Sequence, residues 1–112
     1  MSEQAADPVV AQLREQISDT DLVLLDALNR RLELVSRLHD YKRDRGYDVI
    51  DQSREDWMLA WVTRSNRGPL SADAVRTYWR QILDLTTAEA ARLRAARAGG
   101  EAVSPRRAAP GP

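Results

Sequence analysis

The sequence contains no cysteine, and its single histidine is His39. The lack of cysteine excludes a disulfide framework, a thiolate metal site and a cysteine nucleophile. Lysine plus arginine equals aspartate plus glutamate at 17 each, so a net charge of zero gives no electrostatic sign of a nucleic-acid partner. No apolar run approaches the roughly 20 residues that span a bilayer, and the N-terminus lacks the features of a signal peptide. The composition therefore predicts a soluble cytoplasmic protein with no nucleic-acid or membrane partner.

The first half of the chain carries a strong helical pattern. From Pro8 to about Arg45, apolar residues recur at spacings of three, four and seven, which predicts one long amphipathic helix. Asp7 is the expected N-cap, Pro8 suits the first turn, and Gly46 is expected to stop the helix. At about 1.5 Å per residue this helix extends ~55 Å, longer than a compact domain of this size is wide. Its apolar stripe therefore requires a partner chain.

A second, shorter helix is predicted after this glycine. Ser53 and Asp56, three residues apart, make a capping-box-like start, and Gly68-Pro69 ends the run. Tryptophans at helical spacing are expected in the core or against a partner chain, at Trp57, Trp61 and Trp79.

A third helix is predicted from a Ser71 cap to about Ala98. There is no internal repeat and no strand pattern. The predicted fold class is all-α, with one long, one short and one medium helix per chain. The predicted helical domain covers residues 7–98, and residues 99–112, rich in Gly, Pro, Ala and Arg, form a disordered tail.

Three basic residues on the long helix could bind an anion. Arg31 and Lys42 differ in direction by only ~20° and lie ~16 Å apart along a helix axis, so both side chains can close on one small ligand. Arg14 lies ~25 Å from Arg31 along the same axis, too far to share that ligand within one chain. In an antiparallel dimer, the partner's Arg14 could reach it. Taken singly, each base has the ordinary interpretation of a solvated surface residue.

These bases belong to an ordered set of residues with fixed spacing. The set comprises Leu13-Arg14, Ile17, Asp21, Leu24-Leu25, Leu28, Arg31, Lys42, Asp51, Arg54 and Glu55. Over about residues 10 to 95 it resembles the signature of the all-helical (AroQ-class) chorismate mutases. The resemblance implies an intertwined helical homodimer that rearranges chorismate to prephenate. Because this Claisen rearrangement is unimolecular, the resemblance implies neither a cofactor nor a metal.

The resemblance also implies what the site residues do. Arg31 and the partner's Arg14 bind the two substrate carboxylates, for which a guanidinium fork is well suited. Lys42 contacts a carboxylate and the ether oxygen, where negative charge develops in the transition state.

Further site residues follow from the same resemblance. Asp51, largely through its backbone, and Glu55 hold the hydroxyl at C4 of the substrate, and Arg54 lines the pocket. Thr86 on the third helix supplies a hydroxyl toward the ether oxygen.

One position departs from the family pattern. Where the family has Gln or Glu four residues after the hydroxyl residue, this chain has Ala90. Neighbouring Glu89 fits only if the helix is rotated by one residue, and it must be protonated to help, because an ionised carboxylate repels an oxyanion. His39 is assigned no role.

The sequence leaves several functions open. One is chorismate mutase. A second is a 4-amino-4-deoxychorismate mutase or an isochorismate pyruvate lyase of a secondary pathway, because the Ala90 departure bears on substrate identity. A third is a non-catalytic helical dimerisation or regulatory module. For an enzyme, an activating partner enzyme docking on the C-terminal tail is a further expectation.

Overall fold

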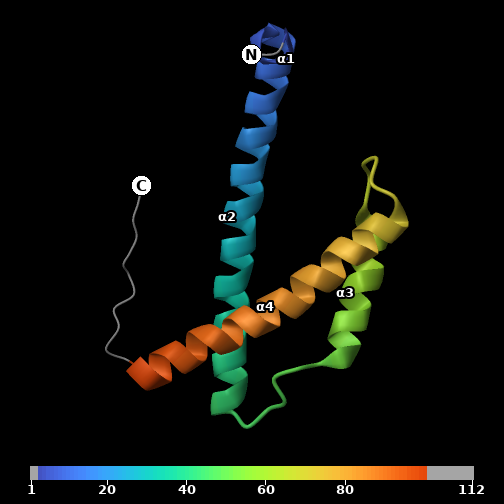
Figure 1. The fold of residues 1–112 in the computed structure, drawn as a ribbon. Helices are drawn as coiled ribbons and strands as arrows, with labels where there is room; N and C mark the ends of the chain where they lie inside the picture. Colours follow the sequence, from blue (N-terminus) through green and yellow to red (C-terminus); the bar gives the residue numbers. More distant parts are fainter. Residues whose placement is uncertain (1–2, 101–112) are drawn as a thin grey trace. The chain divides into compact units, whose positions relative to one another are not determined.

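The computed structural model describes residues 3–100, and the regular secondary structure in that range is entirely helical (Figure 1). The elements are α1 (Glu3–Ala6), α2 (Pro8–Asp44), α3 (Gln52–Ser65) and α4 (Ala72–Gly100). The predicted all-α class is confirmed, and the long, short and medium helices have 37, 14 and 29 residues. The four-residue α1 was not predicted. Since α4 continues to Gly100, it ends slightly later than expected, and the rest of the predicted tail lies outside the described residues.

The described chain divides into two compact units between Arg31 and Leu32, within α2. The first unit contains α1 and the beginning of α2. Here Asp7 acts as the predicted N-cap, because its Oδ1 accepts a hydrogen bond from the backbone N–H of Val9 at 2.8 Å. Pro8 is the first helical residue, a position where a missing N–H leaves no hydrogen bond unmade.

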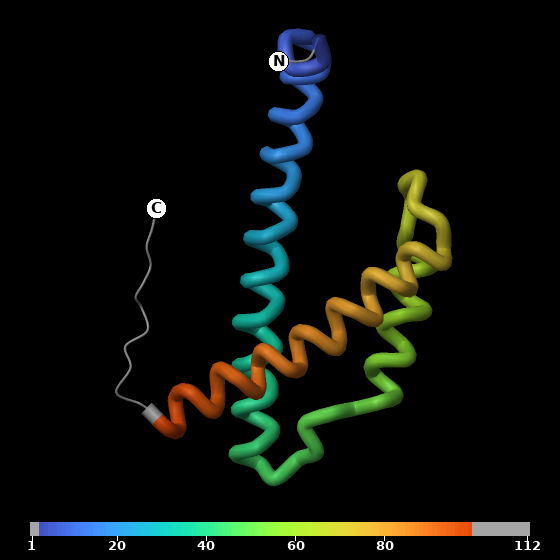
Figure 2. Tube along the Cα trace, viewed as in Figure 1, coloured from blue at the N-terminus to red at the C-terminus, as the bar shows by residue number. Residues whose placement is uncertain are grey.

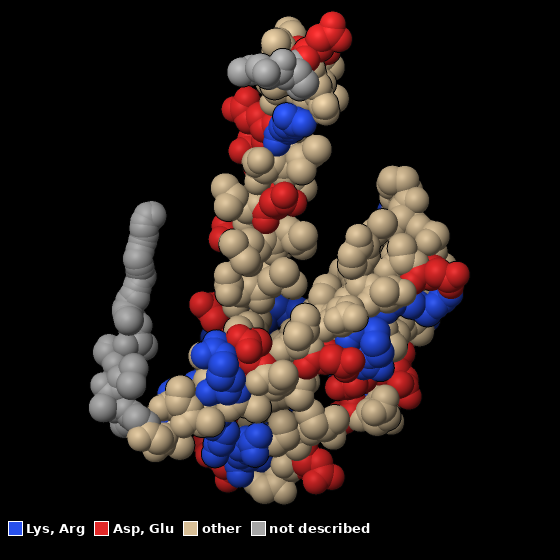
Figure 3. Space-filling view, viewed as in Figure 1, with Lys and Arg blue, Asp and Glu red and all other residues tan. Residues whose placement is uncertain are grey.

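The first unit has no buried residue among residues 3–31. Its large apolar side chains are between 38% and 69% exposed at Val9, Leu13, Ile17, Leu22, Val23, Leu24, Leu25 and Leu28. Figure 3 shows mainly uncharged surface along this part of α2. A group of large apolar side chains exposed along one helix is typical of an interaction site.

The second unit packs α3 against α4, and the chain turns between them at residues 66–71 (Figure 2). The turn is held by Asn66, whose side-chain amide donates to the Leu70 carbonyl at 2.7 Å. Ser71 caps α4 as predicted, since its Oγ accepts from the backbone N–H of Ala74 at 3.1 Å. The buried apolar residues of this unit are Val62, Val75, Leu83 and Ala90.

The last turns of α2 belong to the second unit and contact α4 through ion pairs. Asp40 on α2 accepts hydrogen bonds from Arg94 at 2.9 Å and from Arg97 at 2.8 Å. Beyond Asp44, Gly46 adopts a positive φ of 72°, which turns the chain at the predicted place. Both features fix the end of α2 and the start of the loop that leads to α3.

The predicted start of α3 at Ser53 is wrong. The N-cap is Asp51, which has extended backbone geometry and accepts a hydrogen bond from the Arg54 N–H at 3.1 Å. Aspartate is at least as good an N-cap as serine, and Asp51 lies nearer the preceding loop, so the helix begins two residues earlier than the Ser53 cap implied. Asp56 instead accepts from the Gln52 side chain at 3.0 Å.

The tryptophans of α3 do not lie in the core of the described chain. Trp57 and Trp61 are 43% and 44% exposed, and their rings stack on each other with centroids 5.5 Å apart. Trp79 on α4 is half-buried. Among residues 3–100, no helix combines the length and apolar character needed to cross a membrane.

Candidate active site

Lys42 lies in the last turn of α2, and the following loop folds back over it. The backbone N–H of Tyr47 donates to the Lys42 carbonyl at 2.8 Å, and the half-buried Lys42 ammonium donates to the Val49 carbonyl at 3.2 Å. An ammonium has three N–H donors, so this bond orients Lys42 and leaves donor capacity for an anion.

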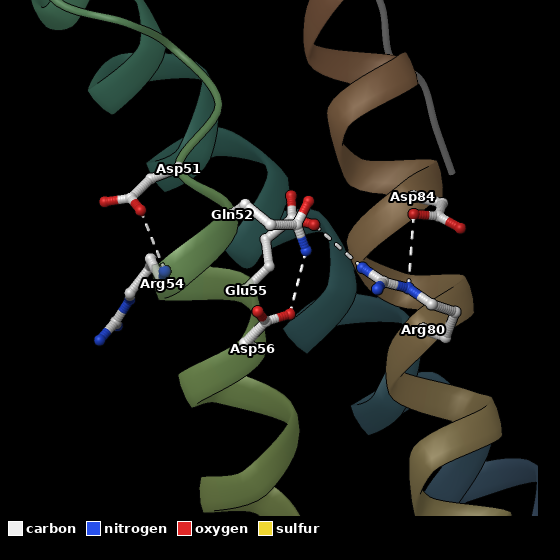
Figure 4. Close-up of polar contacts among 7 residues, drawn as sticks. All are labelled: Asp51, Gln52, Arg54, Glu55, Asp56, Arg80 and Asp84. Carbon is white, nitrogen blue, oxygen red and sulfur yellow. Dashed lines mark hydrogen bonds and ion pairs between the residues drawn. The ribbon is translucent and has the colours of Figure 1, made fainter.

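Glu55 and Arg80 form the main ion pair between α3 and α4. The Glu55 carboxylate accepts from Arg80 Nη2 at 3.0 Å, and the two side chains are 21% and 40% exposed. Figure 4 shows them pointing toward each other, with Asp84 on the far side of the guanidinium. Arg80 Nε lies 3.6 Å from Asp84 and is buried without a hydrogen-bond partner among the described residues. The pair holds Glu55 in one position and balances its charge.

Asp51 and Arg54 lie at the start of α3 but contact different groups. The Asp51 carboxylate is engaged in capping the helix. The Arg54 guanidinium lies over the Trp57 ring, 4.5 Å from its centroid, an arrangement typical of a cation–π contact. Figure 4 shows the Arg54 side chain directed away from the Glu55–Arg80 pair. The structure therefore brings Glu55, but not the Arg54 guanidinium, to α4.

A cavity of about 150 Å³ lies between the end of α2, the following loop and α4. Its walls are formed by His39, Asp40, Arg43, Val49, Ile50, Thr87, Ala90, Ala91 and Arg94. Burial, and then the positive charges of Lys42 and Arg43, lower the pKa of His39 below its ordinary value, and Asp40 opposes this shift. The imidazole is therefore mainly neutral at pH 7 and carries one N–H donor and one acceptor.

The two remaining predicted residues of α4 differ in environment. Thr86 is half-buried. Glu89 receives three hydrogen bonds from Arg92, at 2.9 to 3.2 Å, and these bonds lower the pKa of Glu89. The ion pair thus favours the ionised carboxylate, whereas a role toward the ether oxygen requires the protonated form.

Arg14 and Arg31 belong to the first unit, where Arg14 is exposed and Arg31 is half-buried. Both lie on α2, so the axial separation of ~25 Å expected from a helical rise of ~1.5 Å per residue holds within this unit.

Sequence reasoning missed Arg80 and the cavity beside His39. A signal for Arg80 was available, because Arg80, Leu83, Thr87 and Ala90 are spaced by three, four and three residues and form one helical stripe. A charged residue in a stripe with buried neighbours indicates a specific partner. That partner, Glu55, is 25 residues away in sequence, and only the packing of α3 on α4 brings it there.

Comparison with known proteins identifies the family. The sequence model of the family described as chorismate mutase type II matches residues 13–91, and the chain belongs to this family. Two solved structures of chorismate mutase from Thermus thermophilus are similar to it. Form I is 26% identical, covering 69% of this chain and 96% of that one, with a TM-score of 0.67. Form II is 25% identical, covering 74% and 94%, with a TM-score of 0.71. No curated protein gave a match.

Proposed function

We propose that the protein catalyses the rearrangement of chorismate to prephenate in a homodimer with two equivalent sites. The observation that carries this proposal is the family match over residues 13–91, which includes every predicted site residue. The predicted cytoplasmic location and activating partner enzyme stay predictions.

The proposed mechanism needs only binding and electrostatic stabilisation. One C–O bond breaks while a C–C bond forms, so the enzyme can act by holding the folded substrate and stabilising charge on the ether oxygen. Lys42, oriented by the Val49 carbonyl, supplies a positive charge for this oxygen and for one carboxylate. Arg31 binds a carboxylate, and the partner's Arg14 completes the site.

The exposed apolar surface of the first unit supports the homodimer. Leu13, Ile17, Leu24 and Leu28 lie on α2 at helical spacing and are between 38% and 59% exposed. A second copy of the same helix offers a matching apolar surface, as a two-fold interface requires. Such a dimer also explains how Arg14 can take part in the site. Within one chain, Arg14 lies too far along α2 from Arg31 to bind the same small ligand.

The Glu55–Arg80 pair favours a hydroxyl over an ammonium at C4 of the substrate. Because Arg80 already neutralises Glu55 at 3.0 Å, this carboxylate accepts a hydrogen bond better than it balances a further positive charge. Glu55→Gln should therefore retain appreciable activity with chorismate, since an amide oxygen also accepts. If Glu55→Gln loses more activity with 4-amino-4-deoxychorismate than with chorismate, Glu55 contacts the substituent at C4. Equal losses of activity would show that it does not.

Turnover assays with chorismate, 4-amino-4-deoxychorismate and isochorismate test the proposed function directly. The highest kcat/KM is expected with chorismate. No turnover of any of the three, together with no thermal shift on adding a chorismate-like dicarboxylate, would instead favour a non-catalytic dimerisation module.

A mixing experiment tests the site shared between chains. Arg14→Ala and Arg31→Ala homodimers are each expected to be inactive. After subunit exchange, one site of the heterodimer carries both substitutions and the other carries neither, so each heterodimer should have about half of the wild-type activity, and an equal, fully exchanged mixture about a quarter. A mixture that stays inactive although mass spectrometry shows heterodimers would contradict the shared site. Full activity of Arg14→Ala alone would make Arg14 a surface base.

A further inference from the structure

Arg80 on α4 is bound directly to a predicted site residue of α3. Its Nη2 donates to Glu55 Oε1 at 3.0 Å, where the two helices pack against each other (Figure 4). The Glu55 and Arg80 side chains are only 21% and 40% exposed, so the pair is partly shielded from solvent. Charges shielded in this way act on each other more strongly than charges on the open surface. The charge of Arg80 therefore affects any other group that binds to Glu55.

The ion pair leaves Glu55 able to accept a second hydrogen bond. Arg80 binds Oε1, whereas an ionised carboxylate offers about four lone-pair positions on its two oxygens. A substrate group that donates to the same carboxylate would lie roughly 5–6 Å from the guanidinium, because each of the two hydrogen bonds spans about 3 Å. A neutral donor is tolerated at that distance, but a second positive charge is repelled.

We propose that Arg80 is a specificity-determining residue, which makes Glu55 prefer a neutral hydroxyl to an ammonium at C4 of the substrate. This inference rests on the proposed function and adds a positioning residue to it, because Arg80 acts through Glu55. With chorismate, the C4 hydroxyl donates to a carboxylate that Arg80 holds in place. With 4-amino-4-deoxychorismate, the protonated amine brings a further cation to a carboxylate whose charge is already balanced.

The neighbouring charged groups are less suited to this role. Arg54 is adjacent to Glu55 in the sequence, but its guanidinium lies over the Trp57 ring, 4.5 Å from the ring centroid, and is directed away from the pair (Figure 4). Asp84 lies 3.6 Å from Arg80 Nε, which is longer than a normal hydrogen bond, and its side chain is 68% exposed. Asp84 therefore competes only weakly for the Arg80 charge, and Glu55 is its main partner.

The ratio of kcat/KM for 4-amino-4-deoxychorismate to kcat/KM for chorismate tests the inference. A merely structural role of Arg80 would lower both rates and leave their ratio unchanged. Arg80→Met removes the charge and should raise the ratio at least about tenfold, whereas Arg80→Lys keeps the charge and should stay within about threefold of wild type. Arg80→Gln is a second neutral variant and should shift the ratio in the same direction. An unchanged ratio in the neutral variants, or an equal shift in Arg80→Lys, would overturn the inference.

A double variant tests whether Arg80 acts through Glu55. In the Glu55→Gln background no carboxylate is left to bind the ammonium, so the shift caused by Arg80→Met should be at least about threefold smaller. An equal shift in both backgrounds would mean that Arg80 acts independently of Glu55 and would contradict the proposed role.

Two charge variants on α4 serve as controls. Asp84→Asn removes a negative charge from the exposed side of Arg80, so the ratio should move toward chorismate by less than about threefold. Arg76→Met lies one turn earlier on α4, where Arg76 pairs with the exposed Asp73, and should leave the ratio within about twofold. A shift in Arg76→Met as large as that in Arg80→Met would overturn a specific role of Arg80. Circular dichroism and native mass spectrometry verify the fold and the dimer of each variant.

The outcomes separate the inference from the proposed function. If the wild-type protein converts chorismate but every Arg80 variant has the wild-type ratio, the inference is wrong and the proposed function stands. If the wild-type protein prefers 4-amino-4-deoxychorismate, Arg80 does not exclude an ammonium, and both the inference and the proposed choice of substrate are wrong. If the wild-type protein turns over neither substrate, the proposed function is wrong, and the inference fails with it.

Discussion

The ion pair between Glu55 and Arg80 should couple stability across α3 and α4. The perturbations are Arg80→Met, which removes the guanidinium but keeps an apolar stem, and Glu55→Gln, which removes the charge but keeps the shape. The two single variants and the double variant form a cycle that isolates the interaction from the other effects of each substitution.

The expected coupling follows from the geometry and exposure of the pair. Exposed ion pairs contribute about 0.2–1 kcal/mol, whereas breaking a fully buried pair costs about 3–5 kcal/mol. With an N–O distance of 3.0 Å and side chains 21% and 40% exposed, Glu55 and Arg80 lie between these limits and nearer the first. We expect a coupling free energy of about 1–1.5 kcal/mol, since a hydrogen bond to a charged group contributes about 1.5–3 kcal/mol before solvent screening.

Urea unfolding at one fixed protomer concentration measures the four free energies of unfolding. The Arg76–Asp73 pair on α4 is a matched control, because it has the same chemistry with side chains 51% and 91% exposed. Its coupling should stay below about 0.5 kcal/mol. If the coupling between Glu55 and Arg80 is no larger than that of the control pair, the packing of α3 on α4 does not depend on this ion pair.

Three further predictions concern the end of α2. Lys42→Ala should lower kcat/KM at least ~100-fold with the dimer intact, because one well-placed donor to an oxyanion contributes ~3–4 kcal/mol, and a variant within threefold of wild type would contradict this role. Gly46→Ala should destabilise the fold by about 1 kcal/mol, because alanine disfavours a φ of +72°. An unchanged midpoint of urea unfolding would show that alanine is not strained at this position. The pKa of His39 is lower in the folded chain than its ordinary 6.5, so the unfolded chain binds the proton more tightly. Stability should therefore fall as the pH drops below about 6.5, and His39→Gln should remove this contribution; equal pH profiles for both proteins would refute it. The charged groups around this imidazole are Asp40, Lys42, Arg43 and Arg94.

The helices were predictable because their signals are local. Apolar spacing, the Asp7 cap, the Gly46 stop and the Ser71 cap each depend on a few neighbouring residues, and the structure has all of them. The start of α3 was harder, because Asp51 and Ser53 are both good caps and only the course of the loop decides between them.

The residues of the site could be predicted from their order and spacing in the sequence, but the contacts that orient them could not. Lys42 and Glu55 were singled out by the family pattern, whereas the Val49 carbonyl and Arg80 that orient them carry no motif. The pairing of Glu55 with Arg80 depends on a tertiary contact across 25 residues. His39 was assigned no role from the sequence, and only the structure shows that it lines a cavity together with Ala90.

The ion pairs of Asp40 with Arg94 and Arg97 should make the aspartate less tolerant of mutation than either arginine. One carboxylate on α2 serves two arginines on α4, with a separate oxygen for each of Arg94 and Arg97. Loss of either arginine leaves the other to hold the end of α2 against α4, so each can vary while its neighbour is retained. Loss of Asp40 removes both links at once and leaves two like charges side by side on α4. We therefore expect substitutions to be tolerated at Arg94 or at Arg97 while the other arginine is kept, and to be poorly tolerated at Asp40.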